Sequence, residues 1–264
     1  MKKIAFFDID GTLTSEKSGA IPDSAVMAIR EARAKGNLMF INTGRCLQNV
    51  EKRFREIGFD GYVCGCGTNI YYNEEELLHV AQTHDVTMQI LEQARKTDVD
   101  IIFESKKEIV FDFSRKLHNL EALKLYYGFK AMHYDLSQDP EADDYCCDKF
   151  VIWFKKDEQL AEFRKVSDLY FDCIERGGDF REFVPHSYSK ATGIQFLLDY
   201  FHIPKENAYA FGDSNNDLPM LTFVPNSVAM GNAEPKSLFD KVSYVTEKAS
   251  KGGIKQALEY FSFY

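Results

Sequence analysis

Residues 4–14 read Ile-Ala-Phe-Phe-Asp-Ile-Asp-Gly-Thr-Leu-Thr, an apolar run that stops at two carboxylates and a glycine. Four consecutive apolar residues are too few for a helix and predict a strand that is buried on both faces. Because side chains alternate along a strand, we expect Asp8 and Asp10 on one face, and Gly11 lets the backbone approach a ligand. Ligands bind at the carboxyl ends of parallel strands, so this stretch predicts a reactive strand tip.

The same pattern recurs downstream. Two further short apolar runs follow, and the first of them, residues 38–41, ends at Thr43 and Gly44. Apolar residues at helical spacing predict helices over residues 23–35 and 47–57. An alternation of strand and helix predicts a parallel sheet with right-handed crossovers.

The pattern changes at about residue 83. Paired strand-like runs with helices between them predict an α+β domain inserted into the parallel fold. Residues 131–147 are loop-like and acidic, and we interpret them as a solvated loop. The predicted strands cover residues 99–104, 108–113, 148–154, 171–176 and 180–184, and the predicted helices cover 86–94, 117–127 and 160–166.

The first pattern returns after residue 185. A helix is predicted to begin next to Lys190, and an apolar strand at 209–211 runs into Gly-Asp-Ser-Asn-Asn-Asp at 212–217. The predicted fold class is therefore α/β, with a Rossmann-like parallel sheet core and an inserted α+β cap domain. We place the core at residues 1–82 and 186–264 and the cap at 83–185.

The amino-acid composition argues against some classes of function. The chain has 264 residues, 45% of them hydrophobic, and 32 Lys plus Arg against 41 Asp plus Glu. This negative balance argues against a nucleic-acid or membrane surface. The first apolar run is too short for a signal peptide or a membrane span, so we expect a cytoplasmic protein, monomeric by default.

The six cysteines predict free thiols and no metal site. They form no Cys-x-x-Cys pair, and Cys64-Gly-Cys66 lacks the spacing of a zinc knuckle. Thiols that stay reduced and mostly buried are typical of a reducing compartment.

Three predicted strands end in polar clusters, and if these strands are neighbours, their tips meet in one pocket. That pocket would hold the carboxylates of Asp8, Asp10, Asp213 and Asp217 beside Lys190. Two like charges ~4 Å apart repel by about 4 kcal/mol at an effective dielectric constant near 20. A divalent cation is implied, and oxygen ligands favour Mg²⁺.

The same residues indicate the substrate. Thr43, the amide of Gly44 and Lys190 would bind an anion, and a phosphate monoester fits these partners. With its charge neutralised, the phosphoryl group could be attacked in line by Asp8 to give a phosphoaspartyl intermediate. Asp10 could protonate the leaving alcohol and later deprotonate the attacking water.

Four motifs in this chain resemble those of the haloacid dehalogenase superfamily of phosphatases. They are Asp8-Ile-Asp-Gly-Thr12, Thr43-Gly-Arg45, Lys190 and the 212–217 run, in the order of the superfamily. The insertion between the second and third motifs, and the tail Val228-Ala-Met-Gly-Asn-Ala233, resemble the Cof-type, sugar-phosphatase-like branch with the larger α/β cap (type IIB).

The resemblance implies a role for each matching residue. Asp8 would be the nucleophile and Asp10 the acid/base. Mg²⁺ would be bound by the Asp8 carboxylate, the Asp10 backbone carbonyl and Asp213, and Asp217 would lie outside this set and orient Lys190. The groups that would hold phosphate are the Ile9 amide, Thr43, Gly44, Lys190 and Asn216.

Two stretches depart from the branch's usual pattern. Lys190 is followed by Ala-Thr-Gly where the branch more often has glycine directly, and Cys66-Gly67 stands where Asn-Gly is common. For Arg45 we expect a structural ion pair, and for His186 no role in the site.

The leading hypothesis is a Mg²⁺-dependent phosphatase for a small phosphorylated metabolite, with a sugar phosphate as the first choice. A phosphomutase would use the same aspartyl chemistry, and a non-catalytic sugar-phosphate binder would keep only the pocket. A phospho-signalling receiver would need neither Asp10 nor a cap domain. Product analysis with a sugar phosphate separates these alternatives, because only the phosphatase releases phosphate at every turnover.

Overall fold

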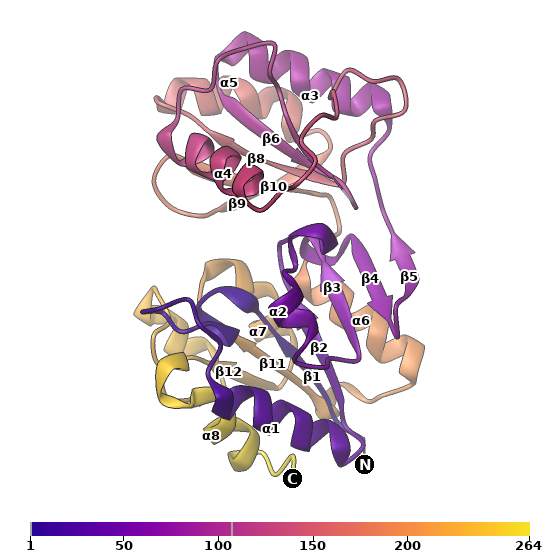
Figure 1. Ribbon diagram of the computed structural model, residues 1–264, viewed down its shortest axis with the longest axis vertical. Helices are drawn as coiled ribbons and strands as arrows, with labels where there is room; N and C mark the ends of the chain where they lie inside the picture. The colour runs from indigo at the N-terminus through magenta and orange to yellow at the C-terminus, as the bar shows by residue number, and fades with distance from the viewer. Residues whose placement is uncertain (1, 107) are drawn as a thin grey trace. The chain divides into compact units, whose positions relative to one another are not determined.

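The computed structural model describes residues 2–106 and 108–264, and the chain forms two compact units (Figure 1). The core unit is Met1–Leu78 with Tyr188–Tyr264, and the inserted unit is His79–Ser187. The limits predicted from the sequence, 83 and 185, lie a few residues inside the inserted unit. The first part of the core sheet ends with β5 (Glu75–His79), a strand that the sequence pattern did not predict.

The core unit is built on an eight-stranded sheet in the order β13-β12-β11-β1-β2-β3-β4-β5. β1 lies in the middle and pairs in parallel with β11 on one side and β2 on the other, so all three strands end at the same edge. The strands are β1 (Ile4–Phe7), β2 (Leu38–Asn42), β3 (Gly61–Cys64), β4 (Asn69–Tyr72), β11 (Ala208–Gly212), β12 (Asn226–Ala229), β13 (Tyr244–Val245) and β5.

Helices cover both faces of the core sheet. Ala5 and Phe7 pack on the side of α1 and α8, whereas Ile4 and Phe6 pack on the side of α6 and α7. All four side chains are buried, as the unbroken apolar run of β1 predicts for a central strand. The core-unit helices are α1 (Asp23–Ala34), α2 (Lys52–Arg55), α6 (Lys190–Phe201), α7 (Leu218–Phe223) and α8 (Gly253–Tyr260).

The inserted unit has a five-stranded antiparallel sheet in the order β7-β6-β8-β10-β9. Phe103 and Phe150 lie on the face of this sheet that packs with Ile90, Leu91 and Phe163 from two helices. The elements are α3 (His84–Thr97), β6 (Asp100–Glu104), β7 (Ile109–Phe111), α4 (Leu120–Ala131), β8 (Lys149–Trp153), α5 (Asp157–Ser167), β9 (Phe171–Glu175) and β10 (Phe180–Pro185).

The predicted helix over residues 47–57 is wrong in part, because the chain there forms a 3₁₀ turn at Leu47–Asn49 and only the short helix α2. The side chain of Arg55 explains the break: it donates hydrogen bonds to the carbonyls of Val50 (3.0 Å) and Leu47 (2.6 Å). These are backbone acceptors that a continuous helix would satisfy itself.

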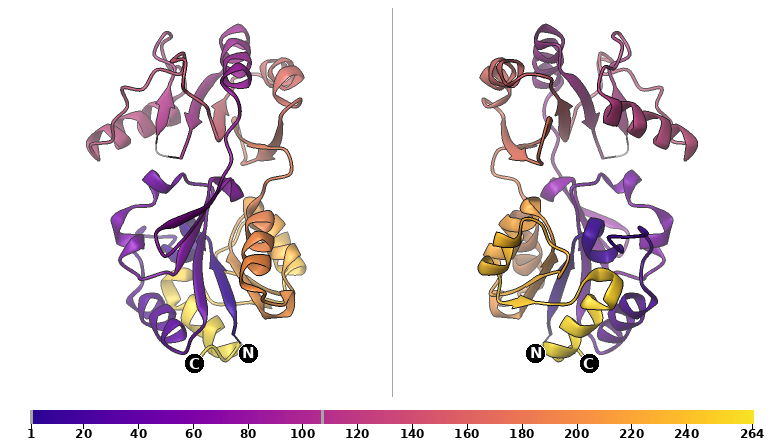
Figure 2. Two further views of the ribbon diagram at one scale, coloured as in Figure 1. Left: turned by 90° about the vertical axis from the view of Figure 1, so that its right-hand side faces the viewer. Right: turned by 90° about the vertical axis from the view of Figure 1, so that its left-hand side faces the viewer.

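The two ends of the described chain lie side by side in the core unit, as Figure 2 shows. The Lys3 Nζ atom donates to the carbonyls of Phe261 (2.6 Å) and Ser262 (2.9 Å), which ties the segment before β1 to the segment after α8. Across residues 2–106 and 108–264, no helix has both the length and the apolar character that crossing a bilayer requires.

Candidate active site

Three neighbouring strands deliver polar residues to one edge of the core sheet. Asp8 follows β1, Thr43 follows β2, and Asp213 follows β11. The Asp8 amide donates to the carbonyl of Phe211 (3.0 Å), and the Thr43 amide donates to that of Val63 (2.8 Å), so the parallel pairing continues to the tips. The predicted convergence of these motifs therefore exists in the structure.

Asp8 and Asp10 do not share a strand face, and that prediction is wrong. β1 ends at Phe7, and the chain turns through Asp10 (φ −79°, ψ 115°) and Gly11 (φ +80°). The Asp8 side chain is buried, whereas the Asp10 side chain is 64% exposed and pairs with Arg45. The alternation rule failed because it holds only while the backbone stays extended.

Gly11 allows the turn to lie directly against Asp213. A Cβ atom at this position would stand 2.1 Å from Asp213 Oδ2, and the positive φ also disfavours a side chain. Thr12 Oγ1 donates to Asp213 Oδ1 (3.1 Å), and Asn232 Nδ2 donates to the Gly11 carbonyl (2.7 Å). The first motif and the C-terminal tail thus fix the Asp213 carboxylate together.

Lys190 reaches into this edge from the first residue of α6. Its Nζ atom lies 2.5 Å from Asp8 Oδ1 and 2.6 Å from Asp217 Oδ1, and the side chain is 1% exposed. Burial alone would lower the pKa of Lys190, but the Asp217 and Asp8 carboxylates outweigh it and raise the pKa above its ordinary value. The lysine therefore carries a fixed positive charge between two carboxylates.

The start of α6 is held on three sides. Ser189 and Thr192 cap it reciprocally: Thr192 N donates to Ser189 Oγ (3.3 Å), and Ser189 N donates to Thr192 Oγ1 (2.9 Å). Asn42 Nδ2 donates to the Lys190 carbonyl (2.9 Å). The Ala-Thr-Gly stretch after Lys190, which departs from the usual pattern, thus supplies the capping threonine.

The Gly65–Gly67 turn links this helix start to the Thr43 loop. Cys66 has φ +55° and donates its amide to the Thr43 carbonyl (3.1 Å). At Gly67, a Cβ atom would stand 2.3 Å from the Ser189 carbonyl oxygen. Asparagine tolerates positive φ better than other residues with side chains, which explains why Asn-Gly suits this turn and Cys-Gly is unusual.

Asp217 is fully buried, and both of its oxygens are engaged. Oδ1 accepts from Lys190, and Oδ2 accepts from the backbone amides of Asp213 (2.8 Å) and Ser214 (3.0 Å). These contacts suit the predicted part of Asp217, which is to orient Lys190 rather than to bind a ligand.

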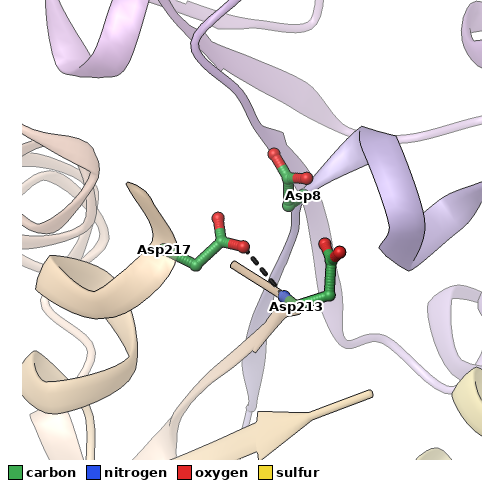
Figure 3. A group of neighbouring side chains, drawn as sticks. All are labelled: Asp8, Asp213 and Asp217. Atoms are coloured by element: carbon green, nitrogen blue, oxygen red, sulfur yellow. Dashed lines mark hydrogen bonds between the residues drawn. The ribbon is translucent and has the colours of Figure 1, made fainter. Parts of the chain in front are cut away.

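Figure 3 shows the three carboxylates of Asp8, Asp213 and Asp217, with a ligand atom of each within 4.8 Å of the others. Burial raises the pKa of Asp8 to about 7, although Lys190 opposes the shift. Burial, followed by the charges of Asp217 and Asp8, raises the pKa of Asp213 to about 8. One ammonium group among three carboxylates leaves negative charge that the site does not neutralise.

This donor set fits a magnesium ion. Asp8 and Asp213 supply carboxylate oxygens, and a small oxygen-only set with excess negative charge is what Mg²⁺ prefers. Mg²⁺ bound here would neutralise the carboxylates and polarise a phosphoryl oxygen.

The residues predicted to hold phosphate come from the same edge. Thr43 is buried, and its Oγ1 accepts from the Arg45 amide (3.2 Å). Gly44 is half-buried beside it, Ile9 is buried in the first turn, and Asn216 is buried with its Oδ1 accepting from Ser214 Oγ. The structure brings these residues to one edge of the sheet, while their roles remain predictions.

Arg45 is the residue that the sequence interpretation undervalued. The expected ion pair exists, but its partner is Asp10, the proposed acid/base. The position of Arg45 directly after Thr43-Gly44 was the available signal. His186 lies in the inserted unit with its Nδ1 atom 2.8 Å from Asp172 Oδ1, and in the acidic loop Glu141 pairs with Arg95 (2.9 Å).

Comparison with known proteins establishes the family. The family model described as haloacid dehalogenase-like hydrolase matches residues 5–258. The chain belongs to this family. Of its six cysteines, Cys46, Cys64, Cys66 and Cys147 are buried.

The relatives of this family member carry phosphatase names. YkrA of Bacillus subtilis, named as a phosphatase, is 27% identical over 97% of this chain and 96% of its own. An HMP-PP phosphatase of Enterobacter is 24% identical over 89% of this chain and 86% of its own. The solved structure of the subclass IIB sugar phosphatase BT4131 has a TM-score of 0.83 and 27% identity, with both chains fully covered. The predicted resemblance and the α/β fold class are confirmed, and the protein is a phosphatase of the haloacid dehalogenase superfamily.

Proposed function

We propose that this phosphatase hydrolyses a small phosphate monoester in a Mg²⁺-dependent reaction through a phosphoaspartyl intermediate on Asp8. The observation that carries the proposal is the buried Lys190, which touches Asp8, while an oxygen of Asp213 lies within 4.8 Å of an oxygen of Asp8. Such a site attracts a cation and a phosphoryl group together, because each neutralises part of the other's charge.

In this proposal, each residue of the site has a defined role. Asp8 forms a bond to phosphorus, and the Lys190 ammonium stabilises negative charge on the transferring group. The Ile9 and Gly44 amides, Thr43 and Asn216 hold the phosphoryl oxygens, and Asp217 keeps Lys190 in place. Asp8, the Asp10 carbonyl and Asp213 would bind Mg²⁺, which when bound polarises the phosphoryl group.

Asp10 supplies the proton chemistry in this proposal. It protonates the leaving oxygen in the first half-reaction and takes a proton from the attacking water in the second. The 64% exposure of its side chain gives water access to the carboxylate, as the second half-reaction requires.

For the substrate, we propose a phosphorylated metabolite of the sugar-phosphate class. A neighbour of 27% identity is named as a sugar phosphatase, and the two B. subtilis relatives YitU and YcsE are named for a phospho-ribitylamino compound. We further propose that the inserted unit acts as the cap that selects the leaving group.

Phosphate release tests the proposal. The purified protein should release phosphate from a panel of sugar phosphates with Mg²⁺ and lose this activity with EDTA, and Asp8→Asn should abolish it while the circular dichroism spectrum is retained. Full activity of Asp8→Asn would exclude covalent catalysis. Isomerised sugar phosphate in place of free phosphate would indicate a phosphomutase, and a ligand-induced melting shift without any product would indicate a binder.

A further inference from the structure

Arg45 holds Asp10 through both carboxylate oxygens. Its Nη2 atom lies 2.6 Å from Oδ1, and its Nε atom lies 3.0 Å from Oδ2. A two-point contact between guanidinium and carboxylate fixes direction as well as distance. The position of the Asp10 carboxylate is therefore set by Arg45.

Arg45 is itself anchored, so it can act as a fixed support. Its Nη1 atom donates to the Asn49 carbonyl (3.1 Å) and to Glu51 Oε1 (3.3 Å), and its guanidinium lies 5.6 Å from the centre of the Phe54 ring. The Arg45 side chain is 19% exposed, against 64% for Asp10. Arg45 is therefore the more firmly held residue of this pair, and the Asp10 side chain is the one that can move away from the contact.

We propose that Arg45 is a positioning residue for the proton transfer by Asp10, an inference that rests on the proposed function. Arg45 keeps the Asp10 side chain at the edge of the site and stabilises the carboxylate that remains after Asp10 has given up its proton.

The first half-reaction transfers the phosphoryl group to Asp8 and a proton from Asp10 to the leaving oxygen. An Asp8 oxygen forms a bond to phosphorus while the bond from phosphorus to the leaving oxygen breaks, and that bond's electron pair stays on the leaving oxygen. The leaving oxygen takes the proton of the Asp10 carboxyl group, and the resulting Asp10 carboxylate returns to the guanidinium of Arg45. The second half-reaction runs the proton in the opposite direction, from water to Asp10.

Two aryl phosphates of nearly the same shape test this role without knowledge of the natural substrate. Phenyl phosphate has a basic leaving oxygen that needs a proton, whereas 4-nitrophenyl phosphate departs without one. We compare kcat/KM, which covers only the steps up to release of the phenol. Asp10→Asn should lose about 100-fold with phenyl phosphate, and Arg45→Gln about 10-fold, with a loss below about 3-fold for Arg45→Gln on 4-nitrophenyl phosphate.

Three further variants keep the test specific. Arg53→Gln is the matched control, because Arg53 also pairs with Glu51 (2.7 Å) and lies over Phe54 (4.6 Å), and it should leave the ratio of the two substrates unchanged. Arg45→Lys keeps the charge without the two-point contact and should restore the ratio in part. Arg45→Gln should not change the ratio further when Asp10 is already Asn.

The outcomes separate this inference from the proposed function. Equal losses on both substrates would overturn it and assign Arg45 to phosphate binding or to folding. A further change of the ratio in the Asp10→Asn, Arg45→Gln double variant would also overturn it, because Arg45 would then act on the leaving group directly. The ratio does not depend on the folded fraction, so a less stable variant still gives an answer. Failure of the unsubstituted protein to release phosphate from either ester with Mg²⁺ would instead defeat the proposed function.

Discussion

Each unit of this protein contains a buried lysine that bridges two carboxylates, and the two clusters differ in kind. Lys190 belongs to the core unit and Lys149 to the inserted unit, and both side chains are almost fully buried. The partners are Asp8 (2.5 Å) and Asp217 (2.6 Å) for Lys190, and Glu104 (2.9 Å) and Glu182 (2.8 Å) for Lys149. Similar local chemistry therefore serves two regions, and burial alone does not mark the functional one.

The charge count separates them. In the inserted unit, Arg176 lies 3.7 Å from Glu182 and adds a second cation beside the two glutamates that Lys149 contacts. In the core unit, Asp213 adds a third carboxylate to the pair bridged by Lys190, and the pKa of Asp213 is raised to about 8. A cluster whose positive and negative charges are paired can serve the fold alone, whereas a cluster with excess carboxylates can bind a cation from solution.

The backbone differs as well. Lys149 and Glu104 face each other on neighbouring strands, so regular β-pairing is enough to bring them together. Lys190 stands at a helix start, and the elements around it use positive φ angles at Gly11 and Cys66. The Lys149 cluster forms through regular geometry, and the proposed catalytic cluster around Lys190 depends on special local conformations.

The largest expected effect comes from removing the positive charge at each site. Lys190→Met should lower kcat/KM for 4-nitrophenyl phosphate with Mg²⁺ by about 1,000-fold, because the developing phosphoryl charge loses its ammonium. Lys149→Met is the matched control and should stay within about 3-fold when both proteins are assayed folded. An equally large loss in Lys149→Met would show that the two clusters are not different in kind.

Replacing Lys149 should lower the stability of the protein, although it leaves the activity nearly unchanged. Lys149→Met leaves buried glutamates without their main cation and should cost about 3–5 kcal/mol of unfolding free energy, measured by urea denaturation. A triple variant with Glu104→Leu and Glu182→Leu added should recover most of that loss, since apolar groups can replace a buried charge cluster. A triple variant as unstable as Lys149→Met would contradict a purely structural cluster.

A smaller effect should appear in the pH dependence of Mg²⁺ binding. Burial raises the pKa of Asp8 to about 7 and of Asp213 to about 8, so the folded protein holds protons there that the unfolded chain has lost. Between about pH 4 and those values, the metal-free protein therefore becomes less stable as pH rises. Mg²⁺ competes with these protons for the same oxygens.

Thermal melting measures this competition. Saturating Mg²⁺ should raise the melting temperature by about 5 °C at pH 8 and by clearly less near pH 5.5. Asp213→Asn should remove most of the shift at both pH values. A Mg²⁺ shift of equal size at both pH values would contradict protonation of the ligands.

The smallest expected effect concerns the backbone of the core cluster. Cys66→Asn places a residue that tolerates positive φ in the Gly65–Gly67 turn and should raise the urea midpoint, with a gain of up to about 1 kcal/mol. Cys64 has an extended backbone (φ −111°), and Cys64→Asn should bring no such gain. A loss of stability in Cys66→Asn would show that packing of the thiol outweighs the backbone strain.

The strand tips could be predicted because each depends on a short, continuous signal. An apolar run that stops at polar residues predicted β1, β2 and β11, and helical spacing predicted α1 and α6. The convergence of Asp8 and Asp213 followed from parallel topology, since neighbouring parallel strands end at the same edge of the sheet.

The elements that the sequence did not predict share a different cause. The pair β4 and β5, the helix α8 and the break near residue 50 depend on tertiary partners, such as the Arg55 side chain that takes the Leu47 and Val50 carbonyls. The direction of Asp10 depends on a turn angle and on Arg45, which stands 35 positions away in the chain. Propensity and periodicity describe neighbours in sequence and carry no information about such partners.

The order of strands in the core sheet has a consequence for how the protein is made. Asp8 and Lys190 stand 182 positions apart, and β1 cannot gain its second neighbour, β11, until the whole inserted segment has left the ribosome. Nascent chains carrying only the first half of the core thus present an open β1 edge, the kind of surface that chaperones shield from aggregation. The proposed catalytic site, which needs Asp8 together with Lys190 and Asp213, is therefore completed only late in synthesis.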